Sequence, residues 1–352
     1  MQPCKRAGYD KTINLDTSYI IKAAAVILML VHHLFTFPNR LPEGAYISLF
    51  SYNGLTIEQF IGGFGKICVS LFLFLSGYGL YISYFGKTIT IKSIIRRILN
   101  FYYHYWTVFM IFIPLGIILN KILFDFKEIL FNWFGLSSSL NSEWWFVYVY
   151  LILTLLFPSI IKLTHHLNGW ILFVISLSLV WVSTYIQFYF FQIILNYQIY
   201  FTMGILICKN SLFDQININF KNNVEVLKVI SWGLLMVSPL FYIILLKLPL
   251  LHQYTFVVIT PIIVFTIGSL NIKSRIIQFI GKSSTNIWLT HSFFCYYYLQ
   301  KLTFAPKYSV LILIWLLILS LLTSYIIDIL INYITNLNYK FSIKKSILKL
   351  WC

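Results

Sequence analysis

The first apolar stretch of the chain, residues 20–35, reads IIKAAAVILMLVHHLF and contains three ionisable side chains, Lys22, His32 and His33. Ionisable groups are costly within a bilayer and usually face a cavity or a partner, so they are candidates for function. A helical residue advances about 100° and rises about 1.5 Å, which places His33 on the face of Lys22, about 16 Å further along, and His32 about 80° to one side. This geometry favours His33 over His32. The structural alternative is that Lys22 extends to the headgroups and the histidines form an interfacial pair.

Basic residues follow a helix with small side chains. In SLFLFLSGYGLYISY (70–84), Ser76 and Gly77 either allow close helix packing or line a narrow passage for an extended ligand. Lys92, Arg96 and Arg97 then form a basic cluster at the start of the next helix. Membrane topology or anionic lipid would explain this cluster, and so would a phosphate-rich ligand, because the planar guanidinium suits phosphate.

The stretch NSEWWFVYVYLILTLLFPSI (141–160) opens with an acid and two tryptophans. Trp144 and Trp145 are typical of an interfacial aromatic belt, or they form a stacking platform for a sugar. Glu143 is either solvated there, or it orients a histidine or binds a sugar hydroxyl. His291 lies nine residues after Lys282, and a single histidine on a helix is more often structural than catalytic.

Several classes of site have no sequence support. The chain contains no phosphate-binding G-x-x-x-x-G-K-[ST] loop, no H-E-x-x-H and no G-x-S-x-G. Its five cysteines are scattered and odd in number, which predicts neither a metal site nor a disulfide framework.

The composition indicates the class of protein to which these residues belong. Of 352 residues, 59% are hydrophobic and 10% are charged, whereas soluble domains have about 25% charged residues. The sequence therefore predicts an all-α polytopic membrane protein. The net charge of +16 does not indicate nucleic acid, because the basic residues gather between apolar runs, as membrane topology requires.

About ten transmembrane helices are expected, since a hydrocarbon core of about 30 Å needs roughly 20 helical residues. The predicted spans are 18–37, 66–85, 98–119, 143–161, 169–189, 192–208, 229–246, 255–271, 286–299 and 309–334. With both termini cytoplasmic, 19 of the 26 lysines and arginines lie inside and 7 outside, which satisfies the positive-inside rule. Residues 1–334 are expected to form one transmembrane domain without a cleavable signal peptide, and residues 335–352 a basic cytoplasmic tail on anionic lipid.

Taken in order, the segments resemble the membrane-bound acyltransferase family 3. Lys22 and His33, with ten residues between them, are similar to the basic residue and histidine of the family's first helix. FLFLSGYGL resembles its F-x-x-S-G-[FY] helix, and Lys92 with Arg96–Arg97 resembles the basic cluster that follows. EWWFVYVYLILTLLFP, YFTMG and IGKSSTNIWLTH resemble the family's later segments, in the same order.

The resemblance implies transfer of an acyl group, usually acetyl from acetyl-CoA, to an extracytoplasmic carbohydrate. It implies a bacterial cytoplasmic-membrane enzyme with no tightly bound cofactor, in a stand-alone form without an SGNH-type hydrolase domain. The acceptor would be a surface polysaccharide or a lipid-linked oligosaccharide. His33 would act as general base or as acyl carrier.

The resemblance also implies roles for the other candidates. Glu143 or His291 would assist His33. The donor-binding residues would be Lys22, Lys92, Arg96 and Arg97, the passage-lining residues Ser76, Gly77 and Tyr78, and the acceptor-binding residues Trp144 and Trp145. The competing class is a flippase, transporter or polymerase of lipid-linked glycans, which would not consume acetyl-CoA.

Overall fold

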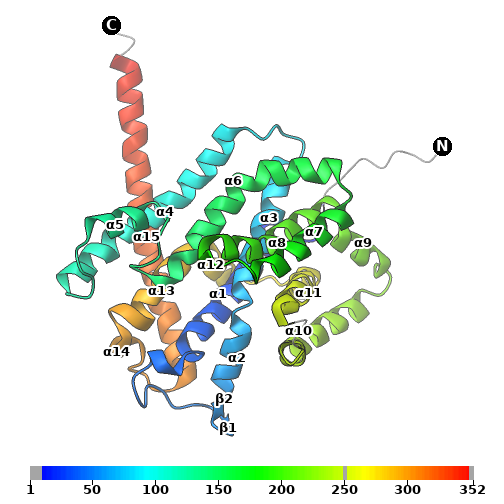
Figure 1. Ribbon diagram of the computed structural model, residues 1–352, viewed down its shortest axis with the longest axis horizontal. Coiled ribbons are helices and arrows are strands. Elements are labelled where there is room, and N and C mark those ends of the chain that lie inside the picture. Colours follow the sequence, from blue (N-terminus) through cyan, green and yellow to red (C-terminus); the bar gives the residue numbers. More distant parts are fainter. Residues whose placement is uncertain (1–9, 249–251, 349–352) are drawn as a thin grey trace. The chain divides into compact units, whose positions relative to one another are not determined.

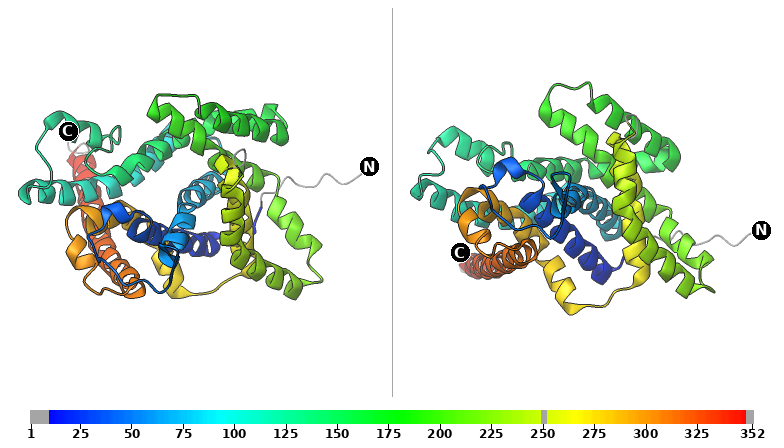
Figure 2. Two further views of the ribbon diagram at one scale, coloured as in Figure 1. Left: turned by 60° about the horizontal axis from the view of Figure 1, so that its bottom comes forward. Right: turned by 90° about the horizontal axis from the view of Figure 1, so that it is seen from below.

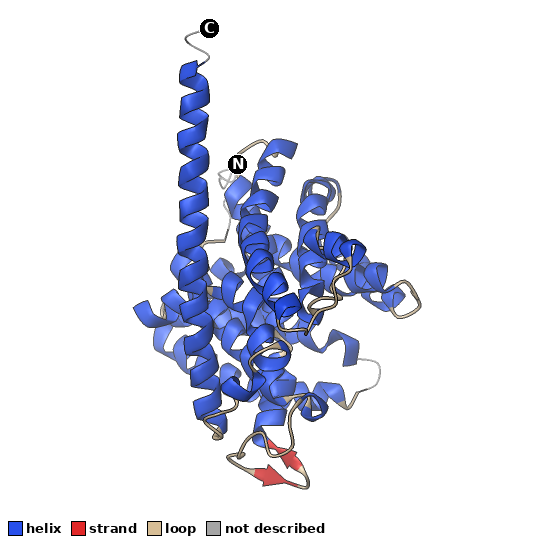
Figure 3. Cartoon of the chain, turned by 90° about the vertical axis from the view of Figure 1, so that its left-hand side faces the viewer, coloured by secondary structure: helices blue, strands red, loops and turns tan. Residues whose placement is uncertain are grey.

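A computed structural model describes residues 10–248 and 252–348 of the chain. Helices dominate, and within these residues one small antiparallel hairpin, β1 (Ser51–Tyr52) and β2 (Leu55–Thr56), is the sheet (Figure 3). The longer helices are α1 (Leu15–Phe35), α3 (Cys68–Tyr84), α4 (Ile91–Ile118), α6 (Trp145–His166), α7 (Gly169–Ser183), α8 (Tyr189–Lys209), α10 (Val224–Leu246), α11 (Thr255–Leu270) and α15 (Ser309–Leu348). The shorter ones are α2 (Ile57–Gly65), α5 (Phe126–Trp133), α9 (Leu212–Asn219), α12 (Arg275–Lys282), α13 (Ser284–Ser292) and α14 (Gln300–Thr303). Single turns occur at Pro38–Arg40, Ser142–Trp144 and His252–Tyr254, and a π-helical turn at Phe293–Tyr297.

Among the described residues, seven helical segments are long and apolar enough to cross a membrane. They coincide with α1, with α2 and α3 together, with α4, α6, α8 and α10, and with the first 27 residues of α15. Two shorter apolar helices, α7 and α11, coincide with the predicted spans 169–189 and 255–271. The predicted span 286–299 falls on α13 and the π-helical turn. The prediction of an all-α polytopic membrane protein is confirmed.

The last helix does not end with the last predicted span. α15 continues from Ser309 to Leu348 and so runs into the predicted basic tail, 335–352. The side chains of residues 336–348, and all of residues 349–352, lie outside the described part of the chain.

The chain divides into two compact units. Unit 1 contains the described residues of 10–38, 48–94 and 146–282, and unit 2 contains 39–47, 95–145 and 283–348. Unit 1 thus holds α1–α3 and α6–α12, while unit 2 holds most of α4 together with α5, α13, α14 and α15.

Helix α1 is uninterrupted for a local reason. Asn14 caps it, because its side-chain oxygen accepts a 2.9 Å hydrogen bond from the Thr17 amide. No glycine or proline follows until Pro38, so the hydrogen-bond ladder runs unbroken from Leu15 to Phe35. The interval from Lys22 to His33 is therefore helical throughout.

In unit 1, α1 packs against both α2 and α12 (Figure 1). Glycines make the contacts close. A Cβ added at Gly62 or Gly65 of α2 would collide with Thr36 or the Leu28 carbonyl, and one added at Gly281 would collide with the Tyr19 carbonyl. Such backbone approach is what small residues permit between membrane helices.

Helices α3 and α8 pack closely in unit 1, and α10 and α11 pack as a second pair (Figure 2). Gly77 of α3 lies against the Phe201 carbonyl, and Gly204 of α8 lies against the Phe74 carbonyl. The two glycines are reciprocal, so each removes the side chain that would hold the other helix away. Gly79, two residues after Gly77, has no neighbouring atom within 4 Å of the position of an added Cβ.

This contact predicts that Gly77→Ala destabilises the protein and Gly79→Ala does not. The added methyl group at Gly77 must push α8 away, and overpacking costs about 1–3 kcal/mol. The thermal stability of the two variants in detergent, followed by the loss of the monodisperse peak on heating, would measure the difference. Equal stability of the two variants would contradict the close α3–α8 contact.

Candidate active site

The two neighbouring histidines of α1 have different surroundings. His32 Nδ1 donates a 2.7 Å hydrogen bond to the Gly62 carbonyl of α2 and lies 3.2 Å from Thr36 Oγ1. The His33 ring packs edge-on against His32 at 5.0 Å between centroids, and lies 6.5 Å from the Phe37 ring. Both side chains are half-buried. Hydrogen bonding to α2 gives His32 a structural role, and the role of His33 in chemistry stays a prediction from the sequence.

Lys22 lies three turns before His33 and has a basic neighbour that the sequence analysis did not assign to a site. The Lys22 ammonium lies 5.6 Å from the centroid of the Tyr19 ring, and the Lys282 ammonium lies 5.3 Å from the same centroid. Lys282 follows Gly281, whose backbone touches α1 at Tyr19. Unit 1 thus places two ammonium groups on one aromatic ring, at the end of α1 away from the histidines.

The predicted passage-lining residues lie on α3 in unit 1. Gly77 makes the contact with α8, the Ser76 hydroxyl donates to the Phe72 carbonyl at 2.8 Å, and Tyr78 is 1% exposed. The Tyr78 hydroxyl donates to the carbonyl and the carboxylate of Asp10, both at 2.9 Å. Close helix packing, one of the two expected explanations of the small residues, therefore accounts for Gly77.

Asp10 also accepts hydrogen bonds from three backbone amides. Its carboxylate accepts hydrogen bonds from the amides of Thr12, Phe213 and Asp214. Tyr78 thus ties the segment before α1 to α3, and Asp10 ties it to the start of α9. The pKa of Asp10 is raised by burial, against the opposing effect of these hydrogen bonds.

The predicted basic cluster lies on the first turns of α4. Lys92 and Arg96 are exposed, and Arg97 is half-buried. The Arg97 Nε is buried and has no hydrogen-bond partner among the described residues. Within this cluster, Arg97 is therefore the residue with a buried donor atom, Nε.

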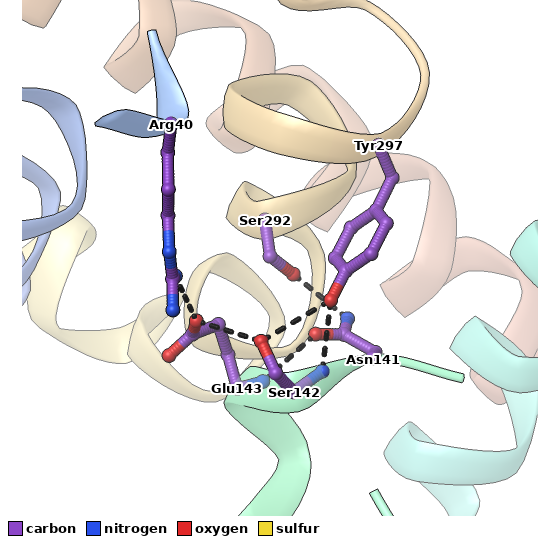
Figure 4. A network of polar contacts seen from close by, with 6 residues as sticks. All are labelled: Arg40, Asn141, Ser142, Glu143, Ser292 and Tyr297. Atoms are coloured by element: carbon purple, nitrogen blue, oxygen red, sulfur yellow. Dashed lines mark hydrogen bonds and ion pairs between the residues drawn. The ribbon is translucent and has the colours of Figure 1, made fainter. Parts of the chain in front are cut away.

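Glu143 lies in unit 2 and is paired with Arg40, a residue that the sequence analysis did not assign to a site (Figure 4). Arg40 Nη1 lies 3.1 Å from Glu143 Oε1, which also accepts a 3.0 Å hydrogen bond from the Ser142 hydroxyl. The side chain of Glu143 is 11% exposed and that of Arg40 is 44% exposed. Because the pair is part-exposed, we expect it to contribute about 0.2–1 kcal/mol to stability, and its main effect is to orient the carboxylate.

The loop before Glu143 is hydrogen-bonded to α13 and to the turn after it (Figure 4). Asn141 Nδ2 donates to Ser292 Oγ at 2.7 Å, and its side-chain oxygen accepts from the Glu143 amide at 3.1 Å. The Tyr297 hydroxyl accepts from the Ser142 amide at 2.9 Å. These bonds fix the direction in which Glu143 points.

The remaining predicted residues of this region differ in exposure. Trp144 is 1% exposed, and its indole N–H donates to the Leu289 carbonyl at 3.1 Å. Stacking on a sugar needs an exposed ring face, so its position does not support an acceptor-binding role, whereas Trp145 is half-buried. His291 is fully buried, and its Nδ1 donates to the Trp288 carbonyl at 2.7 Å. Trp144 and Asn141 bind α13 on either side of His291, so unit 2 brings the segments of Glu143 and His291 together.

A second polar chain in unit 2 has no counterpart in the sequence analysis. His104 Nδ1 lies 2.7 Å from Asn286 Oδ1, and Asn286 Nδ2 donates to Asp328 Oδ1 at 2.8 Å. Because the amide oxygen can only accept, His104 donates from Nδ1. This chain links α4, α13 and α15, and Asp328, an acid within the predicted span 309–334, is its member on α15.

No group of three or more histidines, cysteines or acids among the described residues is arranged to hold a metal ion.

The two ends of α1 present different chemistry in unit 1: a pair of ammonium groups lies at one end and an imidazole pair at the other. Unit 2 presents an oriented carboxylate. An ammonium pair suits a phosphorylated ligand, and an imidazole suits proton transfer.

Comparison with known proteins identifies the family. A family model described as an acyltransferase domain, that of acyltransferase family 3, matches residues 15–329, which include segments of both units. No curated protein and no solved structure matches the chain. The chain belongs to the membrane-bound acyltransferase family 3, and the resemblance inferred from its motifs is confirmed.

Proposed function

We propose that this acyltransferase transfers an acetyl group from cytoplasmic acetyl-CoA to a hydroxyl of an extracytoplasmic or lipid-linked bacterial carbohydrate. The observation that carries the proposal is the arrangement along α1. Lys22 and Lys282 meet at the Tyr19 ring, and His33 lies three turns away on the same unbroken helix. A phosphorylated donor and a base for the acceptor hydroxyl are both needed for this reaction.

The proposed topology has ten transmembrane helices and both termini in the cytoplasm, in the bacterial cytoplasmic membrane. It is supported by the distribution of basic residues and by the presence of a helix within every predicted span. In this orientation Lys22 is near the inner interface and His33 is in the outer half of the membrane. The helix would then connect a donor on one side to an acceptor on the other.

The donor would bind with its phosphates on the lysine pair. Two ammonium groups on one ring repel each other, and a phosphate between or beside them would relieve that repulsion. Lys282 therefore joins Lys22 as a proposed donor-binding residue. Roles for Lys92, Arg96 and Arg97 in donor binding remain predictions, and of these Arg97 has the buried unpaired Nε that an anion could satisfy.

The chemical step needs one base and then one acid. In the direct mechanism His33 takes the proton of the sugar hydroxyl as its oxygen attacks the thioester carbonyl carbon. The carbon–sulfur bond breaks, and the CoA thiolate receives the proton from the imidazolium, which gives the sugar acetyl ester and CoA. In the two-step mechanism the His33 imidazole attacks the thioester carbonyl carbon, the carbon–sulfur bond breaks, and the CoA thiolate leaves with the imidazole proton. The sugar oxygen then attacks the acetyl-imidazole carbonyl carbon, the carbon–nitrogen bond breaks, and the imidazole takes the hydroxyl proton.

In unit 2, contacts of Glu143 and Trp145 with the acceptor remain predictions, and we propose that His291 supports this region structurally. Arg40 and Ser142 hold the Glu143 carboxylate in one orientation. A fixed carboxylate is a suitable acceptor for a sugar hydroxyl hydrogen bond. The complete burial of His291 supports a structural role for it.

Replacing His33 tests the function directly. We expect His33→Gln to lower the transfer of labelled acetyl from acetyl-CoA into surface glycan at least 100-fold in membranes, because general acid–base catalysis contributes about 10²–10⁴-fold. His32→Asn is the matched control, since its amide N–H can still donate to Gly62, and it should retain most of the activity. Both variants must be present at the wild-type level.

Two results would contradict the proposal. If His33→Gln transfers acetyl as fast as wild type, His33 is not the catalytic residue. If wild type transfers no label from acetyl-CoA, the acetyltransferase function fails, and a carrier or polymerase of lipid-linked glycans becomes the better hypothesis.

Replacing Lys282 tests the donor site. We expect Lys282→Gln to raise the KM for acetyl-CoA about tenfold and to leave the KM for acetyl-pantetheine, which has no phosphate, within twofold of wild type. Lys273→Gln, which removes an exposed lysine outside the Tyr19 cluster, is the control and should change neither value. An equal rise in KM for both donors would show that Lys282 supports the fold and does not bind phosphate.

A further inference from the structure

Unit 1 contains a cavity that none of the predicted site residues lines. Its volume is about 190 Å³, and it lies beside the junction between α2 and α3. Its polar wall is formed by Lys66 of the junction, Asn196, Tyr197 and Tyr200 of α8, Tyr242 of α10, and Gln253 before α11. No acidic residue lines it.

The lining has the chemistry that a sugar ring requires. Tyrosine rings offer apolar faces to the C–H groups of a sugar, and their hydroxyls donate and accept hydrogen bonds. The amides of Asn196 and Gln253 add two donors and one acceptor each. The cavity is smaller than the roughly 300–1,000 Å³ of pockets for drug-sized ligands, so it suits about one sugar ring and not a long oligosaccharide.

Lys66 gives the cavity a positive charge. Its side chain is exposed, and its ammonium makes no hydrogen bond or ion pair with any residue in the described part of the chain. A lysine at the edge of a cavity without acids favours an anionic ligand. A single ammonium matches the single charge of a carboxylate, whereas phosphate usually gathers several donors.

The cavity is structurally linked to the histidines of α1 through α2. The Tyr242 hydroxyl, in the cavity wall, donates to the Gly63 carbonyl at 3.2 Å. The preceding carbonyl, that of Gly62, accepts the hydrogen bond from His32. Gly65, next to Lys66, lies against Leu28 and His32. The same short helix therefore positions both the cavity and the imidazole pair, at the end of α1 away from Lys22.

We propose that this cavity binds the acceptor, and that the acceptor is a sugar whose ring carries a carboxylate, as in a uronic acid. The carboxylate would pair with Lys66, and the ring would lie among the tyrosines and amides. This inference rests on the proposed acetyltransferase function and specifies its acceptor. The topology proposed above places Lys66 on the extracytoplasmic side, where such a sugar would arrive.

The test compares two acceptors that differ in charge and by one methyl group: phenyl β-D-glucuronide and its methyl ester. Membranes with the full-length protein receive labelled acetyl-CoA and either sugar, and acetyl incorporation gives kcat and KM for each. We expect wild type to prefer the acid at least tenfold in kcat/KM. Lys66→Gln should raise the KM for the acid about tenfold and leave that for the ester within twofold.

Two further variants separate binding from folding. Lys66→Arg keeps the charge and should keep the preference for the acid, and Lys121→Gln removes another exposed lysine and should change nothing. The inference is wrong if wild type uses both sugars equally, if it labels its own membrane glycan but neither sugar, or if Lys66→Gln impairs both sugars alike. Absence of all acetyl transfer, to glycan as well as sugars, would instead reject the proposed function.

Discussion

The position of α1 depends on backbone contacts that only glycine allows. Gly62 and Gly65 of α2 touch its second half, and Gly281 of α12 touches its first half. In a bilayer, apolar side chains gain little by leaving lipid for protein, so close packing and hydrogen bonds must hold helices together. The three glycines determine which residues of α2 and α12 meet the ends of α1, and so they place His32 beside Gly62 and Lys282 beside Tyr19.

The charged groups of the two units have different kinds of partner. In unit 1, Lys22 and Lys282 both lie over the Tyr19 ring, a contact worth about 0.5–1 kcal/mol at exposed sites. In unit 2, Glu143 has a full countercharge in Arg40 and a hydroxyl donor in Ser142. Two like charges at one ring favour an anionic ligand, while Glu143 is already paired with a cation. This contrast agrees with an anionic ligand in unit 1.

Sequence reasoning succeeded where the geometry is local to one helix. The relation of Lys22 to His33 follows from helical periodicity alone, and the ordered apolar runs predicted the helical spans. It failed where a contact joins distant segments. Nothing near Lys282 in the sequence indicates that Gly281 touches Tyr19, and nothing near Arg40 indicates Glu143. The two tryptophans also look alike in sequence, yet Trp144 is in the core of unit 2 because its N–H finds the Leu289 carbonyl, a partner that belongs to α13.

The order of groups along α1 limits the mechanism. The lysine pair and the imidazole pair are separated by three helical turns, about 16 Å, so no single small group can touch both. Only a ligand with its charged part and its reactive part at opposite ends can use both, and a thioester on a long phosphorylated carrier has this form. Under the proposed function, the acceptor would approach from the histidine end, where α2 also borders the Lys66 cavity. The proposed transfer across the membrane would then need no movement of the protein's own charged groups through the hydrocarbon.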